Sequence, residues 1–146
     1  MSARVFVDTN VLVYLFDAAE PGKRALAAAT LEREGAEHQL VVSTQVLQEL
    51  FVALTRGNHP IASAELAREA VEAASAYATV EVDAPLVLQA IDLSRQCRLS
   101  LWDALIVSAA RRAGCQRLLT EDLNAGQVID GVRIENPFAR TSPRSR

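Results

Sequence analysis

Apolar residues along the chain form short continuous runs that alternate with longer segments of helical spacing. The short runs are rich in β-branched and aliphatic side chains, as β-strands are, and they lie at 5–7, 40–42, 79–82, 117–119 and 132–134. In the longer segments apolar residues recur every three or four positions, which indicates helices. Strands separated by helices predict a parallel sheet that helices cover on both faces. We therefore expect one α/β domain with three layers and a central parallel sheet.

The ends of the expected helices are marked by caps and glycines. A short helix begins around Val11, and further helices are expected over 21–34, 44–56, 63–77, 83–96 and 100–113. Asp83 and Ser100 stand where a side chain can accept a hydrogen bond from the first helical turn. Gly35 and Gly114 each follow an expected helix, and glycine often ends one. The boundaries therefore carry local chemical signals.

The composition fits a globular protein in water. Of the 146 residues, 50% are hydrophobic and 23% are charged. No apolar run approaches the roughly 20 residues that span a bilayer, so we expect a soluble, cytoplasmic protein with no membrane partner. Residues 140–146 are basic and lack large apolar side chains. We expect them to form a disordered tail beyond a domain at 1–139.

The charge excludes one class of nucleic-acid-binding protein. The chain has 15 Lys and Arg against 18 Asp and Glu, a net charge of −3. Such a protein does not hold nucleic acid by bulk positive charge, although a local basic groove remains compatible with this balance. Lys23 is the only lysine, so any chemistry that needs a lysine depends on it.

Few side chains suggest covalent catalysis. Cys97 and Cys115 are too few for a cysteine zinc site, and we expect both to be reduced thiols. Trp102 and Phe51 are expected to pack in the core rather than to stack on bases. No serine, cysteine or histidine stands in a persuasive catalytic arrangement. The candidate chemistry therefore lies with the acids.

Two acids follow expected strands. Asp8 comes directly after the run at 5–7, and Asp122 follows the run at 117–119 after a short interval. In an open parallel sheet, ligands bind beyond the carboxyl ends of the strands. Asp8 suits a functional role and a helix cap equally well, whereas Asp122 taken alone is typical of a turn.

Asp103 and Glu49 lie on expected helices. Asp103 fits a capping box with Ser100, but it lies off the polar arc of its helix, between Val107 and Ala110. A carboxylate on an apolar flank is costly unless it is paired or binds a cation, so both interpretations stay open. Glu49 lies on the flank of its helix and is typical of a solvated residue. The pattern alone does not select it.

Taken together, these acids belong to four short motifs that occur in a recognisable order. The motifs are Val-Asp-Thr-Asn at 7–10, Gln-Glu-Leu at 48–50, Trp-Asp-Ala-Leu-Ile at 102–106 and Thr-Glu-Asp-Leu at 120–123. In this order, and on these elements, they resemble a PIN domain. The likeness is greatest to the VapC toxins of bacterial and archaeal toxin–antitoxin pairs, and it covers essentially residues 4–138.

The resemblance implies an α/β/α PIN-like fold and an endoribonuclease that depends on Mg²⁺ or Mn²⁺. The acidic residues of the family map onto Asp8, Glu49, Asp103 and Asp122, which would bind the metal and carry the catalysis. Glu121 competes with Asp122 for the last place, since neighbouring side chains point to different sides of an extended chain.

Assisting residues and partners follow from the same resemblance. Thr9 or Thr120 would assist a water or a metal-bound carboxylate, and Asn10 would orient Asp8. The implied partners are an RNA substrate, a small cognate antitoxin and a second copy of the chain in a homodimer. The alternative is a PIN-like module that binds RNA or protein without cutting.

Overall fold

The computed structural model describes residues 3–139, and the basic segment 140–146 lies outside them. The strands are β1 (Arg4–Val7), β2 (Gln39–Ser43), β3 (Ala78–Val80), β4 (Arg117–Leu119), β5 (Val128–Ile129) and β6 (Val132–Glu135). The helices are α1 (Thr9–Tyr14), α2 (Pro21–Glu37), α3 (Thr44–Thr55), α4 (Ala64–Ala74), α5 (Ala84–Cys97) and α6 (Leu101–Arg112). Each strand expected from the sequence overlaps an observed one.

The strands form one sheet in the order β3-β2-β1-β4-β6-β5. All neighbouring strands are parallel except β5 and β6, which pair antiparallel. The expected central parallel sheet is therefore confirmed, with one short antiparallel strand added at its edge. The chain passes from β1 to β2 and β3 on one side of β1, and later adds β4 on the other side. This reversal places the expected ligand crevice at the carboxyl ends of β1 and β4.

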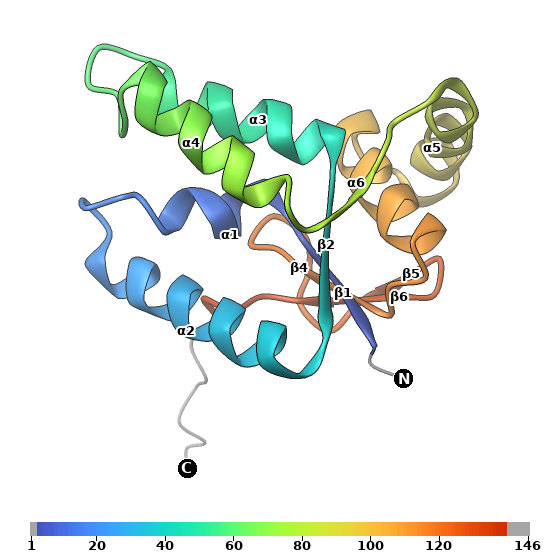
Figure 1. The fold of residues 1–146 in the computed structure, drawn as a ribbon. Coiled ribbons are helices and arrows are strands. Elements are labelled where there is room, and N and C mark those ends of the chain that lie inside the picture. Colours follow the sequence, from blue (N-terminus) through green and yellow to red (C-terminus); the bar gives the residue numbers. More distant parts are fainter. Residues whose placement is uncertain (1–2, 140–146) are drawn as a thin grey trace.

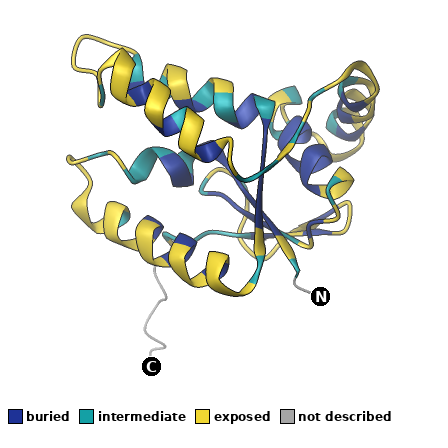
Figure 2. Cartoon of the chain, in the orientation of Figure 1, coloured by how far each residue is buried: buried dark blue, intermediate teal, exposed yellow. Residues whose placement is uncertain are grey.

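Helices cover both faces of the sheet, which confirms the three-layer α/β architecture. In Figure 1, α1 and α2 lie on one side of the strands, and α5 and α6 lie on the other. Helix α6 contacts β2, β4 and β6, and α5 packs against α6. Helix α3 leaves the end of β2 and packs against α1 and α4. The strands and the inner helix faces are buried, while the outer helix faces are exposed (Figure 2).

The helix caps follow the sequence closely, with one exception. The side chains of Ser43, Ser63, Asp83 and Ser100 each accept a hydrogen bond from a backbone N–H in the first turn of their helix. Helix α2, however, continues through Gly35 to Glu37, so the expected end before Gly35 is wrong. A Cβ at Gly35 would lie 3.4 Å from Leu40 Cδ1. This is an ordinary van der Waals distance, so a methyl group would also fit, and this glycine neither ends the helix nor is required by its packing on β2.

The core is built on the strands and on the middle of α6. Val5, Phe6 and Val7 are fully buried. Trp102 is 63% exposed and Phe51 is 37% exposed, so the expectation that both pack in the core is wrong. Trp102 precedes the buried stretch of α6, which begins at the next turn with small and aliphatic residues. Within residues 3–139, no helix is both long and apolar enough to cross a membrane.

Candidate active site

Asp8 lies at the carboxyl end of β1 and is only 4% exposed. One carboxylate oxygen accepts a hydrogen bond from the backbone N–H of Thr9 at 2.7 Å, and the other accepts one from Thr120 Oγ1 at 2.8 Å. Asp8 is therefore the N-cap of α1 and is also held from β4. The capping role that its sequence position suggested is therefore confirmed.

The electrostatic surroundings of Asp8 oppose its negative charge. Burial raises the pKa of Asp8 to about 7, although the hydrogen bonds from Thr120 and Thr9 act in the opposite direction. The negative charges of Asp122 and Glu49 raise this pKa further. A buried carboxylate in this state gains stability from any cation that reaches it.

Glu49 lies on α3, half-buried, and faces Asp8 rather than open solvent. Its carboxylate accepts a hydrogen bond from Thr9 Oγ1 at 2.7 Å and another from Gln45 Nε2 at 3.0 Å. Gln45 also donates to the backbone carbonyl of Trp102 at 3.2 Å, which ties α3 to the first turn of α6. The interpretation of Glu49 as a solvated helix residue is therefore wrong. Its partner Thr9 lies forty positions away in sequence, so helical periodicity did not contain this signal.

Asp103 lies in the first turn of α6, where its backbone N–H donates to Ser100 Oγ at 3.1 Å. This contact confirms the capping role of Ser100. The Asp103 carboxyl is half-buried, and burial raises its pKa. The charges of Asp122 and Glu49 act in the same direction. Asp103 is thus close enough to Asp122 and Glu49 for their negative charges to raise its pKa.

Glu121 and Asp122 point to different surroundings. Asp122 raises the pKa of both Asp8 and Asp103 through its charge, and its backbone N–H donates to Thr120 Oγ1 at 3.1 Å. Glu121 instead accepts hydrogen bonds from Tyr14 Oη at 2.6 Å and from Lys23 Nζ at 2.5 Å. The acids that interact at the carboxyl ends of β1 and β4 are therefore those at 8, 49, 103 and 122. We call them the four-acid site.

Asn10 and Thr120 connect the two sides of this site. Asn10 Nδ2 donates to Thr120 Oγ1 at 3.3 Å, and the backbone N–H of Glu121 donates to Asn10 Oδ1 at 3.1 Å. Asn10 therefore acts on Asp8 through Thr120, whose hydroxyl is the direct partner of the carboxylate.

The four-acid site is not a preformed metal cage. Within the part of the chain that the structure describes, no three Asp, Glu, His or Cys side chains converge closely enough to hold an ion as they stand. The donor set nevertheless suits a hard divalent cation. Mg²⁺ is usually held by only one or two carboxylates, together with waters and substrate phosphates.

A groove of about 590 Å³ runs from the four-acid site between α1 and α3. Glu49 and Asp122 line one part of it. The other lining residues are Thr9, Asn10, Val13, Tyr14, Asp17, Gln48, Val52, Ala53 and Arg56. Among the described residues, Arg56 makes no ion pair. The groove thus combines apolar walls with acids and a free guanidinium.

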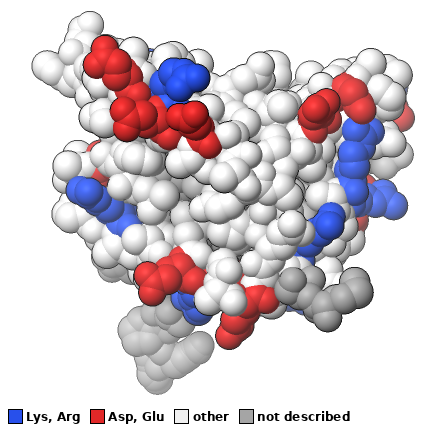
Figure 3. All heavy atoms as spheres, viewed as in Figure 1, with Lys and Arg blue, Asp and Glu red and all other residues white. Residues whose placement is uncertain are grey.

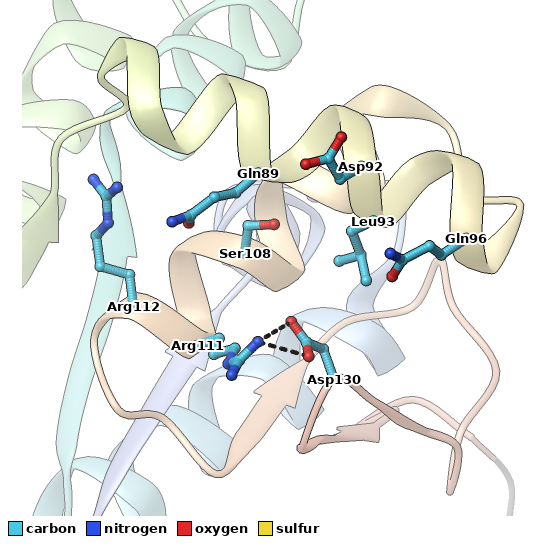
Figure 4. A pocket seen from close by; sticks show the side chains of 8 residues that line it. All are labelled: Gln89, Asp92, Leu93, Gln96, Ser108, Arg111, Arg112 and Asp130. Atoms are coloured by element: carbon cyan, nitrogen blue, oxygen red, sulfur yellow. Dashed lines mark hydrogen bonds and ion pairs between the residues drawn. The ribbon is translucent and has the colours of Figure 1, made fainter.

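A second pocket of about 470 Å³ lies between α5, α6 and the β5–β6 turn (Figure 4). At its edge, Arg111 Nη1 donates to both carboxylate oxygens of Asp130, each at 2.7 Å. Ser108 and Gln89 point into it (Figure 4). This pocket lies at the opposite end of α6 from Asp103, and none of the four acids lines it. We therefore place the candidate chemistry at the four-acid site.

Charged side chains do not gather into a single patch on the face of the molecule that Figure 3 shows. On the face shown in Figure 3, acidic and basic side chains occur in separate small groups with a broad uncharged area between them. This agrees with the exclusion of binding by bulk positive charge. A nucleic-acid ligand would need local contacts.

Comparison with protein families identifies the class of protein. A model of the PIN domain matches residues 5–129. The chain therefore belongs to the PIN domain family, as its four motifs predicted. Among curated proteins, none matches the chain significantly.

Several solved structures share the fold. A toxin–antitoxin complex from Klebsiella pneumoniae aligns with a TM-score of 0.68 and 21% identity, covering 92% of this chain and 98% of that one. VapBC2 from Rickettsia felis, bound to a promoter DNA fragment, gives 0.66 and 17%, covering 91% and 98%. Mycobacterium tuberculosis VapC20, described as a toxin that cleaves the sarcin–ricin loop, gives 0.59 and 24%, covering 78% and 86%.

Proposed function

We propose that this chain is the toxin of a toxin–antitoxin pair and acts as a divalent-metal-dependent endoribonuclease. The observation that carries the proposal is the four-acid site at the carboxyl ends of β1 and β4, with Asp8 buried and electrostatically coupled to Asp122 and Glu49. Toxin–antitoxin complexes and a toxin that cleaves the sarcin–ricin loop, among the proteins of similar fold, support this assignment.

The residues that would hold Mg²⁺ or Mn²⁺ are Asp8, Glu49, Asp103 and Asp122, which are also the catalytic residues of the proposal. When bound, the ion neutralises charge on the phosphodiester and activates the attacking water. The protein contributes orientation. Thr120 fixes the Asp8 carboxylate, and Thr9 fixes that of Glu49.

The groove between α1 and α3 is the proposed path of the RNA strand. It begins at Glu49 and Asp122 and contains Arg56. A guanidinium can bind a phosphate with two parallel hydrogen bonds, and the apolar wall formed by Val13 and Val52 offers a surface for a base. We expect single-stranded or looped RNA to be cut endonucleolytically and DNA to be a poor substrate.

The proposed protein partner is a small antitoxin with a basic tail. A site of four acids attracts an Arg or Lys from such a tail, and an Arg can pair with a carboxylate through two hydrogen bonds. The groove at the site is lined by α1 and α3, because α1 packs against both α2 and α3. The tail is therefore assigned to the α1–α3 groove.

The deciding experiment measures cleavage of single-stranded RNA by the wild type and by Asp8→Asn in Mg²⁺ or Mn²⁺. We expect internal cuts with the wild type, none in excess EDTA, and loss of at least about 100-fold in rate for the variant, as for removal of a group that acts in the transition state. Cleavage that persists in EDTA would refute the metal mechanism. RNA binding without cleavage would favour the alternative, a non-catalytic PIN-like module.

Two further expectations accompany the proposal. A homodimer and a cytoplasmic location are implied by the resemblance to VapC toxins. Light scattering on the purified chain measures the first, and fractionation of cells that express it measures the second.

A further inference from the structure

Lys23, the only lysine of the chain, joins four segments beside the four-acid site. From α2, its Nζ donates to Glu121 Oε2 at 2.5 Å and to Tyr14 Oη at 3.1 Å. It also lies 4.8 Å from the centroid of the Tyr14 ring and 5.9 Å from that of Phe138. The Tyr14 and Phe138 rings pack edge to face, 4.8 Å apart. One ammonium group thus holds α1, α2, the loop after β4 and the C-terminal segment together.

Glu121 is fixed through both its side chain and its backbone. Tyr14 Oη donates to the carboxylate of Glu121 at 2.6 Å, in addition to the bond from Lys23. The backbone N–H of Glu121 donates to Asn10 Oδ1 at 3.1 Å. The side chains of Lys23 and Glu121 are only 36% and 26% exposed, so this ion pair is less screened by water than a pair on open surface.

Glu121 stands between Thr120, a hydrogen-bond partner of Asp8, and Asp122, a member of the four-acid site. On one side, Thr120 donates to Asp8, and on the other, Asp122 acts on Asp8 and Asp103 through its charge. Glu121 and Asp122 are consecutive residues of the bend that follows β4, so the direction of one side chain constrains that of the other. Holding Glu121 toward α1 and α2 therefore turns Asp122 toward the other acids.

Lys23 also neutralises the negative charge of Glu121. Released from Lys23, Glu121 would be a fifth carboxylate adjacent to the four-acid site, able to compete for the same cation. Paired with Lys23, it is locally neutralised and turned away. We propose that Lys23, together with Tyr14, is a positioning residue that clamps Glu121 so that Asp122, and not Glu121, faces the metal. This inference rests on the proposed function, in which Asp122 is a metal ligand.

The test compares Lys23→Met, which keeps the length of the side chain and removes its charge, with Lys23→Arg and with Arg111→Gln. The last variant is a matched control, because it breaks the Arg111–Asp130 ion pair at the opposite end of α6. Two quantities are measured: amide hydrogen exchange of residues 120–126 in metal-free protein, and Mn²⁺ affinity by titration calorimetry.

We expect Lys23→Met to speed exchange in residues 120–126 and to weaken Mn²⁺ binding about 10-fold, since residues that orient metal ligands typically contribute 10- to 100-fold. Lys23→Arg should restore most of both, and Arg111→Gln should leave both unchanged. In RNA cleavage, Lys23→Met should lower kcat with little change in KM. Unchanged loop exchange and Mn²⁺ affinity in Lys23→Met would overturn the proposal.

Glu121→Gln and the double variant Lys23→Met/Glu121→Gln distinguish a clamp from a direct ligand. If Lys23 acts through Glu121, the two substitutions are not additive. The double variant then has a Mn²⁺ affinity no lower than that of whichever single variant binds Mn²⁺ less tightly. If Glu121 is itself a ligand, Glu121→Gln is the more damaging change and the clamp is refuted. A wild type that neither binds Mn²⁺ nor cleaves RNA refutes the proposed function instead, and loop exchange, measured without metal, still decides whether Lys23 orders the loop.

Discussion

Asp8 has a structural role in the fold and is also a residue of the proposed metal site. It caps α1 and accepts a hydrogen bond from Thr120 across the sheet, so it belongs to the structure of the fold. It is also buried, and the charges of Glu49 and Asp122 act on it, so its ionised form is destabilised. The pKa values of Asp8 and Asp103 are both raised, chiefly by burial, and the charges of Asp122 and Glu49 raise them further.

The raised pKa of Asp8 predicts how the stability of the metal-free protein depends on pH. Its pKa is about 7 in the folded state against 3.8 when unperturbed, so the folded state binds more protons between these values. With respect to this group the folded protein is most stable below the unperturbed pKa of 3.8, loses stability as pH rises from there to about 7, and loses no more above that pH. A shift of this size corresponds to about 4 kcal/mol at most, at about 1.4 kcal/mol per pKa unit.

Chemical denaturation at pH 5 and pH 8, in EDTA, measures this effect. Asp8→Asn removes the titrating group, so the difference between wild type and variant isolates Asp8 from all other carboxyls. We expect the free energy of unfolding of the wild type, relative to the variant, to be lower at pH 8 than at pH 5. A difference that does not change with pH would contradict the raised pKa.

A bound divalent cation should offset the stability that the protein loses when Asp8 ionises. The unfolded chain has no assembled site, so an ion that binds the folded state stabilises it by mass action, by about 2.7 kcal/mol at a concentration 100 times Kd. For a protein of this size we expect Tm to rise by several degrees in Mg²⁺ or Mn²⁺. Asp8→Asn should largely lose the rise, and Arg111→Gln should keep it. An equal rise in Asp8→Asn would place the ion elsewhere.

At the scale of elements, the site depends on helices that are tied together across the groove. Thr9 of α1 donates to Glu49 of α3, and Gln45 of α3 donates to a carbonyl of α6. These contacts bring side chains from three helices to the ends of two strands. The groove between α1 and α3 also contains Arg56, the residue that directly follows the helix of Glu49 as its C-cap.

Arg56→Gln tests the groove as the path of RNA. Losing one phosphate contact should weaken substrate binding, so we expect KM for single-stranded RNA to rise several-fold while kcat changes little. The dependence of KM on salt should also become shallower, because fewer counterions are released on binding. The rise of Tm in Mn²⁺ should be unchanged. Steady-state kinetics at two salt concentrations provide the measurement, and an unchanged KM would remove the groove from the RNA path.

The elements that could be predicted from the sequence are those with local signals. The apolar run at 5–7 and the caps Asp83 and Ser100 lie within a few residues of the structure they specify, and the fold class followed from them. Strand β5 has only two residues and is antiparallel, so it left no run to detect. Trp102 was misplaced because helical spacing does not say where along its length a helix meets the sheet.

The candidate site was less accessible to sequence reasoning than the fold. Asp8 stood out because it follows a strand. The contact that places Glu49 at the site is its hydrogen bond with Thr9, far away in sequence, so only the resemblance to PIN domains identified Glu49 as a candidate. The choice between Glu121 and Asp122 depends on Lys23, which lies 98 positions from Glu121. Contacts of this range arise from the packing of α1 and α2 beside the loop after β4, and no local pattern contains them.

At the scale of the whole molecule, the site is open to partners as well as to substrate. Asp122 is exposed, and the groove leads from it across the surface between α1 and α3. A crevice that attracts a divalent cation also attracts a guanidinium or ammonium group, so a basic peptide in the groove would occupy the place of both ion and RNA. The same acids would then account for activity and for its control.

Expression in a bacterial host tests this view. We expect the wild-type chain expressed alone to arrest growth, and co-expression of a small basic-tailed protein encoded beside it to relieve the arrest by forming a tight complex. Asp103→Asn should abolish the arrest, because it removes a proposed metal ligand. The charges of Asp122 and Glu49 act on Asp103, which places it with the other acids of the site. Arg111→Gln, altered at the other end of the same helix, should arrest growth like the wild type. If Asp103→Asn expressed at equal level arrests growth as strongly as the wild type, the toxicity does not arise from catalysis at the four-acid site.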